Sequence, residues 1–395
     1  LQGKESWFLP FNKGYKDGAG NPPNPDGLMT DYLWKQVLTK DMLSRIIENY
    51  ATLVEEKDEE TGKTRYKQIF PRYHQLTAVE SLLADVKKNG VGNRYLIQHS
   101  AGSGKSNSIA WLAHQLTGLE DAQGNLLVDS VIVVTDRVVL DKQIRDTIRQ
   151  FAQTRNIIAW AEHSGDLRKA IEDGRRIIIT TIGKFPYVLP EIGEDHKDRH
   201  FDIIIDEAHS SQNGKTAGTM NMTLSAIMSD PDMDNEDKIN AMCEGKKLLT
   251  NASYFAFTAT PKNKTLETFG TAYEDAGVIK HRPFHVYTMK QAIQEGFILD
   301  VLKYYTPIDS YYRLKKTVED DPMFDKKKAQ KKLRAFVENQ TFTIAQKADM
   351  MVSHFHEQVI AKGKIGGQAR AMIITSSIER CIESVSYTHL RAHET

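Results

Sequence analysis

The sequence predicts an α/β fold in which a parallel sheet is covered by helices on both faces. Short apolar runs, rich in β-branched and aromatic residues, alternate with segments of helical character, and continuous apolar runs are typical of strands buried on both faces. Polar residues follow these runs directly, at the strand ends where parallel sheets bind ligands. The runs are residues 95–97, 131–134, 177–179, 201–205 and 254–257.

Composition sets the first limits on function. The 395 residues are 40% hydrophobic and 26% charged, which allows two or three domains with a sizeable core. The 52 basic residues balance 52 acidic ones, so any nucleic-acid binding must come from local patches. Two distant cysteines, Cys243 and Cys381, form no C-x-x-C pair, which suits a reducing, cytoplasmic location. No apolar run approaches about 18 residues, so we expect no membrane span.

The region before residue 71 is expected to be a linker. The chain begins with Leu1 and has no signal peptide, so we expect it to be cut from something longer. A Gly/Pro/Asn-rich loop at residues 14–27 precedes a helix over residues 31–47, whose apolar residues recur with a core-facing period. Residues 55–67 are charged and broken by glycine, which predicts a solvated hairpin or linker.

Residues 98–106 have the composition of a phosphate-binding loop. An apolar run precedes them and a helical run follows, which is the context such a loop needs. Glycines permit a tight turn that aims backbone N–H groups at one anion, and the start of the helix adds the positive end of its dipole. His99 stands where G-x-x-x-x-G-K-[ST] has its first glycine. The expected phosphate-binding residues are Ala101, Gly102, Ser103, Gly104, Lys105 and Ser106.

Two carboxylates at the end of the run 201–205 complete the expected site. Lys105 is predicted to contact the β- and γ-phosphates of a nucleotide, and Ser106 to hold Mg²⁺. Asp206 is expected to hold the same metal, and Glu207 to orient or deprotonate the attacking water. These assignments make Lys105, Asp206 and Glu207 the predicted catalytic residues.

Other candidate residues have weaker signals and competing interpretations. Gln75, with Arg72 nearby, can read an adenine edge, but an exposed surface glutamine fits the sequence almost as well. His209 can link the nucleotide site to the turn after residue 257, or be structural. Thr180, Thr181 and Lys184 can contact a nucleic-acid backbone, although helix capping also explains the threonines.

Two further groups are given structural readings. His281 and His285 enclose Pro283, which prevents the helical spacing of a metal site, so metal binding there is not favoured. The lysine-rich residues 311–338 are read as a solvated helix face, with a phosphate-backbone contact as the alternative.

The order of these motifs resembles the superfamily 2 helicases and translocases. The glycine-rich loop is followed by Asp-Glu-Ala-His at residues 206–209 and Thr-Ala-Thr-Pro at residues 258–261. Flanking stretches look like the restriction (R) subunit of type I restriction-modification enzymes over about residues 7–383. Those stretches are residues 8–14, 18–22, 32–34, 135–143, 371–372 and 376–381.

The resemblance implies a RecA-like fold and a motor that uses ATP and Mg²⁺ to pull double-stranded DNA. It implies that Thr258, Ala259 and Thr260 couple two lobes, and that modification (methyltransferase) and specificity subunits are partners. The nuclease residues of the family are expected upstream of this chain. The implied divisions are a nuclease end and helical linker at 1–70, a first lobe at 71–305, a charged helical connector at 306–362, the start of a truncated second lobe at 363–383 and a foreign tail at 384–395.

Two alternatives stay open at this stage. Another superfamily 2 motor, such as an RNA helicase, has the same ATP motifs. A non-catalytic nucleotide-binding fragment is the third reading, because the second lobe has one expected strand, over residues 371–375.

Overall fold

The computed structural model describes residues 9–57, 64–135, 147–148, 158–161, 163–181, 192, 196–206, 251–300, 341–363 and 370–392. The chain separates into two compact units, Leu1–Val301 and Leu302–Thr395, and each is described by itself. None of the helices within these ranges has the length and apolar character needed to cross a lipid bilayer.

A seven-stranded sheet forms the centre of the first unit. Its order is β11-β3-β8-β7-β4-β6-β5, and every pairing in it is parallel. All strand carboxyl ends therefore meet at one edge, as the sequence predicts. The strands are β3 (Arg94–His99), β4 (Ser130–Thr135), β5 (Ile158–Trp160), β6 (Ile177–Thr181), β7 (Phe201–Ile205), β8 (Ala252–Thr258) and β11 (His285–Tyr287).

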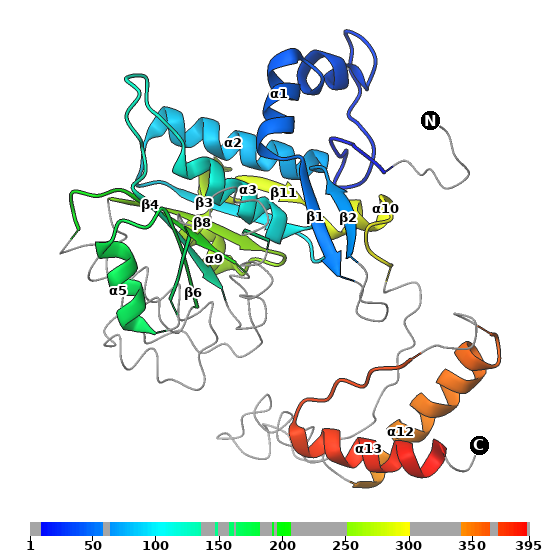
Figure 1. Ribbon diagram of the computed structural model, residues 1–395. Helices are drawn as coiled ribbons and strands as arrows, with labels where there is room; N and C mark the ends of the chain where they lie inside the picture. Colours follow the sequence, from blue (N-terminus) through cyan, green and yellow to red (C-terminus); the bar gives the residue numbers. More distant parts are fainter. Residues whose placement is uncertain are drawn as a thin grey trace. The chain divides into compact units, whose positions relative to one another are not determined.

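Helices cover both faces of this sheet (Figure 1). The helices α2 (Tyr73–Asn89) and α3 (Lys105–Thr117) pack on one face, and α5 (Ser164–Glu172) and α9 (Asn263–Phe269) on the other. Successive strand residues enter opposite cores, so Ile97 packs with α2 and α3 while its neighbour Leu96 packs in the second core. The RecA-like α/β fold expected from the sequence is confirmed.

The N-terminal helix is broken, and its predicted core-facing side is wrong in part. A π-helical turn, η1 (Leu33–Val37), is followed by α1 (Lys40–Asn49), because the Thr39 hydroxyl accepts a hydrogen bond from the Met42 N–H and caps a new helix. The break leaves Trp34 and Ile47 exposed by 52% and 62%. The hairpin prediction is confirmed, since β1 (Thr52–Lys57) pairs antiparallel with β2 (Thr64–Ile69).

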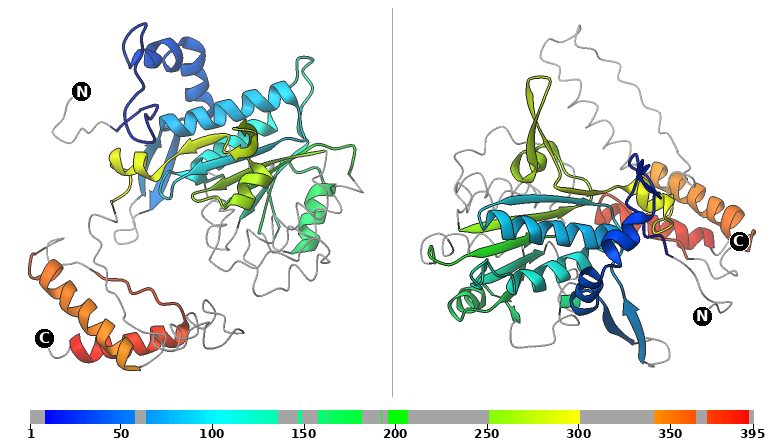
Figure 2. Two further views of the ribbon diagram at one scale, coloured as in Figure 1. Left: turned by 180° about the vertical axis from the view of Figure 1, so that it is seen from behind. Right: turned by 90° about the horizontal axis from the view of Figure 1, so that it is seen from above.

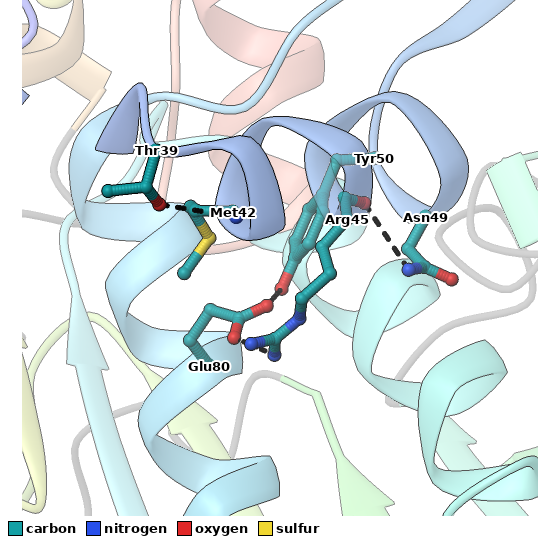
Figure 3. A network of polar contacts seen from close by, with 6 residues as sticks. All are labelled: Thr39, Met42, Arg45, Asn49, Tyr50 and Glu80. Atoms are coloured by element: carbon teal, nitrogen blue, oxygen red, sulfur yellow. Dashed lines mark hydrogen bonds and ion pairs between the residues drawn. The ribbon is translucent and has the colours of Figure 1, made fainter. Parts of the chain in front are cut away.

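An aromatic clasp, formed by Tyr50, Glu80 and Trp111, joins α1 to α2 and α3. The Tyr50 hydroxyl donates to Glu80 Oε1 at 2.7 Å, and the Trp111 indole N–H donates to the Tyr50 carbonyl oxygen at 3.1 Å. The two rings pack with centroids 5.5 Å apart. Arg45 pairs with the other Glu80 oxygen (Figure 3). The clasp thus attaches the middle of α2 and the middle of α3 to the end of α1.

A second hairpin and a short helix follow α9. The hairpin of β9 (Thr271–Asp275) and β10 (Val278–Arg282) extends from the body of the sheet, and it is yellow-green in Figure 2. The helix α10 (Met289–Gln294) follows β11 and contacts the N-terminal loop. Gln294 accepts a hydrogen bond from the Ala19 N–H, and the Thr288 hydroxyl donates to the Asp17 carbonyl.

The described part of the second unit is helical. The helix α12 (Thr341–Phe355) continues into η4 (His356–Ile360), as predicted, and packs against α13 (Ile378–Ala392). The strand predicted over residues 371–375 is wrong, since that stretch has no strand pairing among the described residues and Met372 is 83% exposed. An apolar β-prone run becomes a strand only where a neighbouring strand accepts its backbone hydrogen bonds.

Candidate nucleotide-binding site

The phosphate loop, residues 100–104, connects β3 to α3 at the carboxyl edge of the sheet. Gly102 and Gly104 have φ angles of 70° and 80°, in the left-handed region that favours glycine. A Cβ at position 104 would also lie 2.6 Å from the Gln75 amide nitrogen, so any side chain there would displace the Gln75 amide. The predicted strand, loop and helix are confirmed, and the two glycines are required by the backbone.

Three side chains at the start of α2 hold the carbonyl groups of this loop. His74 Nε2 lies 3.1 Å from the Ser103 carbonyl oxygen, and the Gln75 amide donates to the Gly104 carbonyl at 2.9 Å. The Arg72 guanidinium approaches the Gly102 carbonyl at 3.5 Å. The Ser103 N–H donates to the Ser100 carbonyl within the loop at 3.3 Å. In a trans peptide the N–H points opposite to the carbonyl, so the contacts at the Ser103 and Gly104 carbonyls turn the N–H groups of Gly104 and Lys105 away from α2. Such an arrangement presents donors to an anion.

Gln75 is buried rather than exposed. Its amide oxygen accepts a hydrogen bond from the Arg72 N–H at 2.9 Å, which caps α2. Its amide nitrogen donates to the loop carbonyls of Ser103 and Gly104. The alternative of an exposed surface glutamine is therefore wrong. Contact between Gln75 and adenine stays a prediction.

Lys105 and Ser106 begin α3, where the helix dipole is positive. Lys105 is buried, with 8% of its surface exposed. Asp206 directly follows β7, is 6% exposed and donates its N–H to the Val134 carbonyl at 2.9 Å. The donor set fits a phosphate with a divalent metal, since the loop N–H groups and Lys105 suit the anion and Ser106 and Asp206 supply hard oxygens.

The strand β8 lies between β3 and β7, so its end separates the phosphate loop from Asp206. Thr258 is buried and pairs with Gln98, and the Thr260 N–H donates to the Thr258 hydroxyl at 3.3 Å. Ala259 and Thr260 are progressively more exposed. The turn is placed beside the phosphate loop, and its coupling role stays a prediction.

A buried histidine network lies under the phosphate loop, and sequence reasoning missed it. His99 Nε2 lies 2.9 Å from His285 Nδ1, and His285 Nε2 lies 3.1 Å from the Thr77 hydroxyl. The His74 ring stacks on Tyr287 with centroids 3.6 Å apart. The one signal in the sequence was His99 in place of a glycine. Within the described residues, no group of three or more His, Cys, Asp or Glu is arranged to hold a metal ion.

Burial keeps these three histidines neutral. It lowers the pKa of His74 to about 3 and that of His285 to about 4, and it holds the pKa of His99 well below its usual range. The imidazoles therefore act as hydrogen-bonding groups at neutral pH. They support the loop without adding positive charge beside Lys105.

Comparison with known proteins identifies the family. The model of the SWI2/SNF2 ATPase family matches residues 74–335, which include the phosphate loop and Asp206. The C-terminal part of a type I restriction enzyme endonuclease subunit from Mycoplasma pneumoniae is 31% identical over 159 residues, covering 36% of this chain and 73% of that protein. The chain belongs to the SWI2/SNF2 ATPases of type I restriction endonuclease subunits.

A longer relative shows how much of such a subunit this ATPase region spans. A type I restriction enzyme endonuclease subunit of Staphylococcus aureus is 27% identical over 235 residues. The match covers 58% of this chain and 21% of that subunit. The chain thus spans about a fifth of that relative's length.

Solved structures of similar proteins are distant. A fragment of an HsdR subunit of a type I restriction enzyme from Vibrio vulnificus is 14% identical, covers 92% of this chain and 60% of its own, and has a TM-score of 0.44. A Sulfolobus solfataricus SWI2/SNF2 ATPase core in complex with double-stranded DNA is 18% identical, covers 49% of this chain and 34% of its own, and has a TM-score of 0.30.

The remaining predicted residues of this ATPase are placed as follows. Thr180 is buried and Thr181 is partly exposed, both at the carboxyl end of β6. Their contact with DNA stays a prediction. Glu207, His209 and Lys184 lie outside the described residues, as do residues 311–338.

Proposed function

We propose that this chain is the ATP-dependent double-stranded DNA translocase part of a type I restriction enzyme R subunit. It acts in the cytoplasm with modification and specificity subunits, and it pulls DNA before a nuclease domain cuts it. The observation that carries the proposal is the phosphate loop, whose carbonyls are held by His74 and Gln75 while Lys105 and Asp206 are buried at the same sheet edge. The family and its named relatives supply the biological setting.

The site residues divide the work of ATP hydrolysis. The loop N–H groups and Lys105 bind the phosphates and neutralise their charge. Ser106 and Asp206 would hold Mg²⁺, which when bound would supply positive charge to stabilise the charge of the phosphates. Glu207, assigned from the sequence, orients the attacking water and accepts its proton.

The proposal that DNA is the substrate is based on a similar protein and on the residues at the end of β6. The Sulfolobus SWI2/SNF2 core was solved with double-stranded DNA. In this chain Thr180 and Thr181, at the end of β6, and Lys184, which comes after it in the sequence, are proposed to contact a phosphate backbone. Thr258, Ala259 and Thr260 are proposed to relay the nucleotide state between lobes.

Substitution of Lys105 tests the nucleotide site. Lys105→Ala is expected to weaken Mg-ATP binding at least tenfold, because a hydrogen bond to a charged group contributes about 1.5–3 kcal/mol. Calorimetric titration measures it, with Lys88→Ala as the matched control, since Lys88 is an exposed lysine in the last turn of α2. Equal affinity of the Lys105 variant and the parent, both folded, would refute the assignment.

The kind of polynucleotide that stimulates ATP hydrolysis distinguishes a DNA translocase from an RNA helicase. Steady-state phosphate release by the complete R subunit is expected to rise with duplex DNA and to stay at its basal level with single-stranded RNA. Glu207→Gln is expected to retain ATP binding and to abolish the release. Stimulation by RNA alone would favour the helicase alternative.

A further inference from the structure

The segment after α10 forms a wall beside the phosphate loop. The helix α10 ends in a Schellman motif, in which the Phe297 N–H donates to the Ala292 carbonyl at 3.0 Å and the Gly296 N–H donates to the Ile293 carbonyl at 3.0 Å. Gly296 takes the left-handed conformation that this motif needs, with φ of 76°. The backbone at Phe297 is therefore fixed by the end of the helix.

Side chains on α10 and β11 hold the same segment from below. Glu295 accepts hydrogen bonds from the Tyr287 hydroxyl at 2.8 Å and from the Gln291 amide at 2.9 Å. Tyr287 in turn stacks on His74, which contacts the loop carbonyl of Ser103. Tyr287 therefore connects the wall, through Glu295, to the phosphate loop, through His74.

Two residues of this wall, Phe297 and Ile298, contact Arg72 and the phosphate loop respectively. The Arg72 guanidinium lies over the Phe297 ring at 3.7 Å. A Cβ at Gly102 would meet the Ile298 side chain at 3.3 Å, so Ile298 already packs against the bare backbone of the loop. Phe297 and Ile298 are both partly exposed, so the wall is open to solvent on one side.

The Arg72–Phe297 pair has the chemistry of a base-stacking platform. A planar guanidinium that lies on an aromatic ring keeps its charge and its orientation, and its planar face can stack on a nucleobase. Burial lowers the pKa of Arg72, yet guanidinium remains protonated in proteins. Without the ring, the long arginine side chain would sample several rotamers before any base could stack on it.

We propose that Phe297 is a positioning residue for the nucleoside base, holding Arg72 flat so that a purine stacks on the guanidinium beside the phosphate loop. The inference rests on the proposed function, because it assumes that the loop binds nucleotide phosphates. It goes beyond that function in assigning base affinity to a residue of the wall. A stacking platform has a larger contact with purines than with pyrimidines, so the site is expected to favour ATP over CTP.

The test separates the base from the phosphates by using two probes, Mg-ATP and inorganic tripolyphosphate with Mg²⁺. The Phe297→Ala variant is expected to bind ATP about tenfold more weakly, because Arg72 then loses the ring that orients its stacking face and the base loses most of that contact. It is expected to bind tripolyphosphate as the parent does. Phe297→Tyr keeps the ring and is expected to restore ATP affinity. Arg72→Lys keeps the charge without the planar face, so it should reproduce the alanine variant's selective loss.

A matched control removes an arginine-bound ring elsewhere. Tyr273 lies under Arg282 at 5.4 Å on the β9–β10 hairpin, and Tyr273→Ala is expected to leave both affinities unchanged. Equal losses of ATP and tripolyphosphate in Phe297→Ala would mean that the ring only supports the loop, and no loss would mean that it does neither; both results overturn the inference. If the parent itself binds neither probe, the proposed function has failed as well.

Discussion

The helix pair α2 and α3 buries polar groups in different ways at its middle and at the end beside the phosphate loop. At the aromatic clasp, Tyr50, Glu80 and Trp111 satisfy one another through hydrogen bonds of 2.7 and 3.1 Å. Under the phosphate loop, His99 Nδ1 and the hydroxyls of Ser100 and Ser103 are buried with no hydrogen-bond partner among the described residues. An unsatisfied buried polar atom costs about 1–3 kcal/mol, so the loop end is the less stable arrangement.

The difference separates a structural region of the helix pair from a functional one. Polar groups that lack partners in a folded protein are concentrated where a ligand or a moving proton completes them. The clasp needs no ligand, because the Tyr50 hydroxyl and the Trp111 indole N–H already have hydrogen-bond acceptors within it. Changes at the clasp should therefore affect stability, and changes at the loop should affect nucleotide binding first.

The largest expected effect is the loss of the clasp indole. Trp111→Ala is expected to lower the free energy of unfolding by about 3–5 kcal/mol, because it removes a fully buried ring and the partner of the Tyr50 carbonyl. Urea unfolding measures the change, and Leu126→Ala, at a side chain that is 52% exposed, is the control. ATP affinity of the folded variant should stay near the parent's. A large loss of ATP affinity without loss of stability would break the comparison.

Acid is expected to act at the loop end. The folded-state pKa values of His74 and His285, about 3 and about 4, lie below the ordinary histidine value of 6.5, so the unfolded chain binds more protons between these values. Stability is then present above about pH 6.5 and falls on acidification. Each histidine costs about 2 kcal/mol between pH 7.5 and pH 5.

A buried carboxyl at the opposite edge of the sheet works against this trend. Burial raises the pKa of Asp202 from 3.8 to about 7, so its folded form takes up a proton on acidification and regains about 2–3 kcal/mol over the same range. Asp202→Asn removes that gain. Urea midpoints at pH 7.5 and pH 5 should therefore fall further in this variant than in the parent, and equal falls would contradict the assigned shifts.

The smallest expected effect is the loss of one clasp hydroxyl. Tyr50→Phe removes the hydrogen bond to Glu80, while Arg45 still pairs with that carboxylate, so we expect a loss of about 1 kcal/mol in unfolding free energy. Tyr66→Phe is the control, because the Tyr66 ring is 63% exposed. Identical urea midpoints for the two variants would show that the hydroxyl adds nothing to the clasp.

Residue types and their spacing were enough to predict the sheet, the phosphate loop and the ATPase family. Continuous apolar, β-prone runs indicate strands that are buried on both faces of a sheet. The spacing of Gly102, Gly104 and Lys105 indicates a tight turn that leads directly into a helix. These features are local, so residue type and spacing are enough to predict them. The same reasoning failed at residues 31–47 and 371–375, where a Thr39 cap and the absence of a described strand partner overrode the apolar pattern.

The tertiary structure alone decided what surrounds the loop. His285 reaches His99 across 186 positions because β11 pairs with β3 in parallel register, and no local signal encodes that pairing. Phe297 meets Arg72 for the same reason, since α10 follows β11 at the carboxyl edge. Long-range pairing depends on the packing free energy of the whole sheet, which a run of neighbouring residues does not contain.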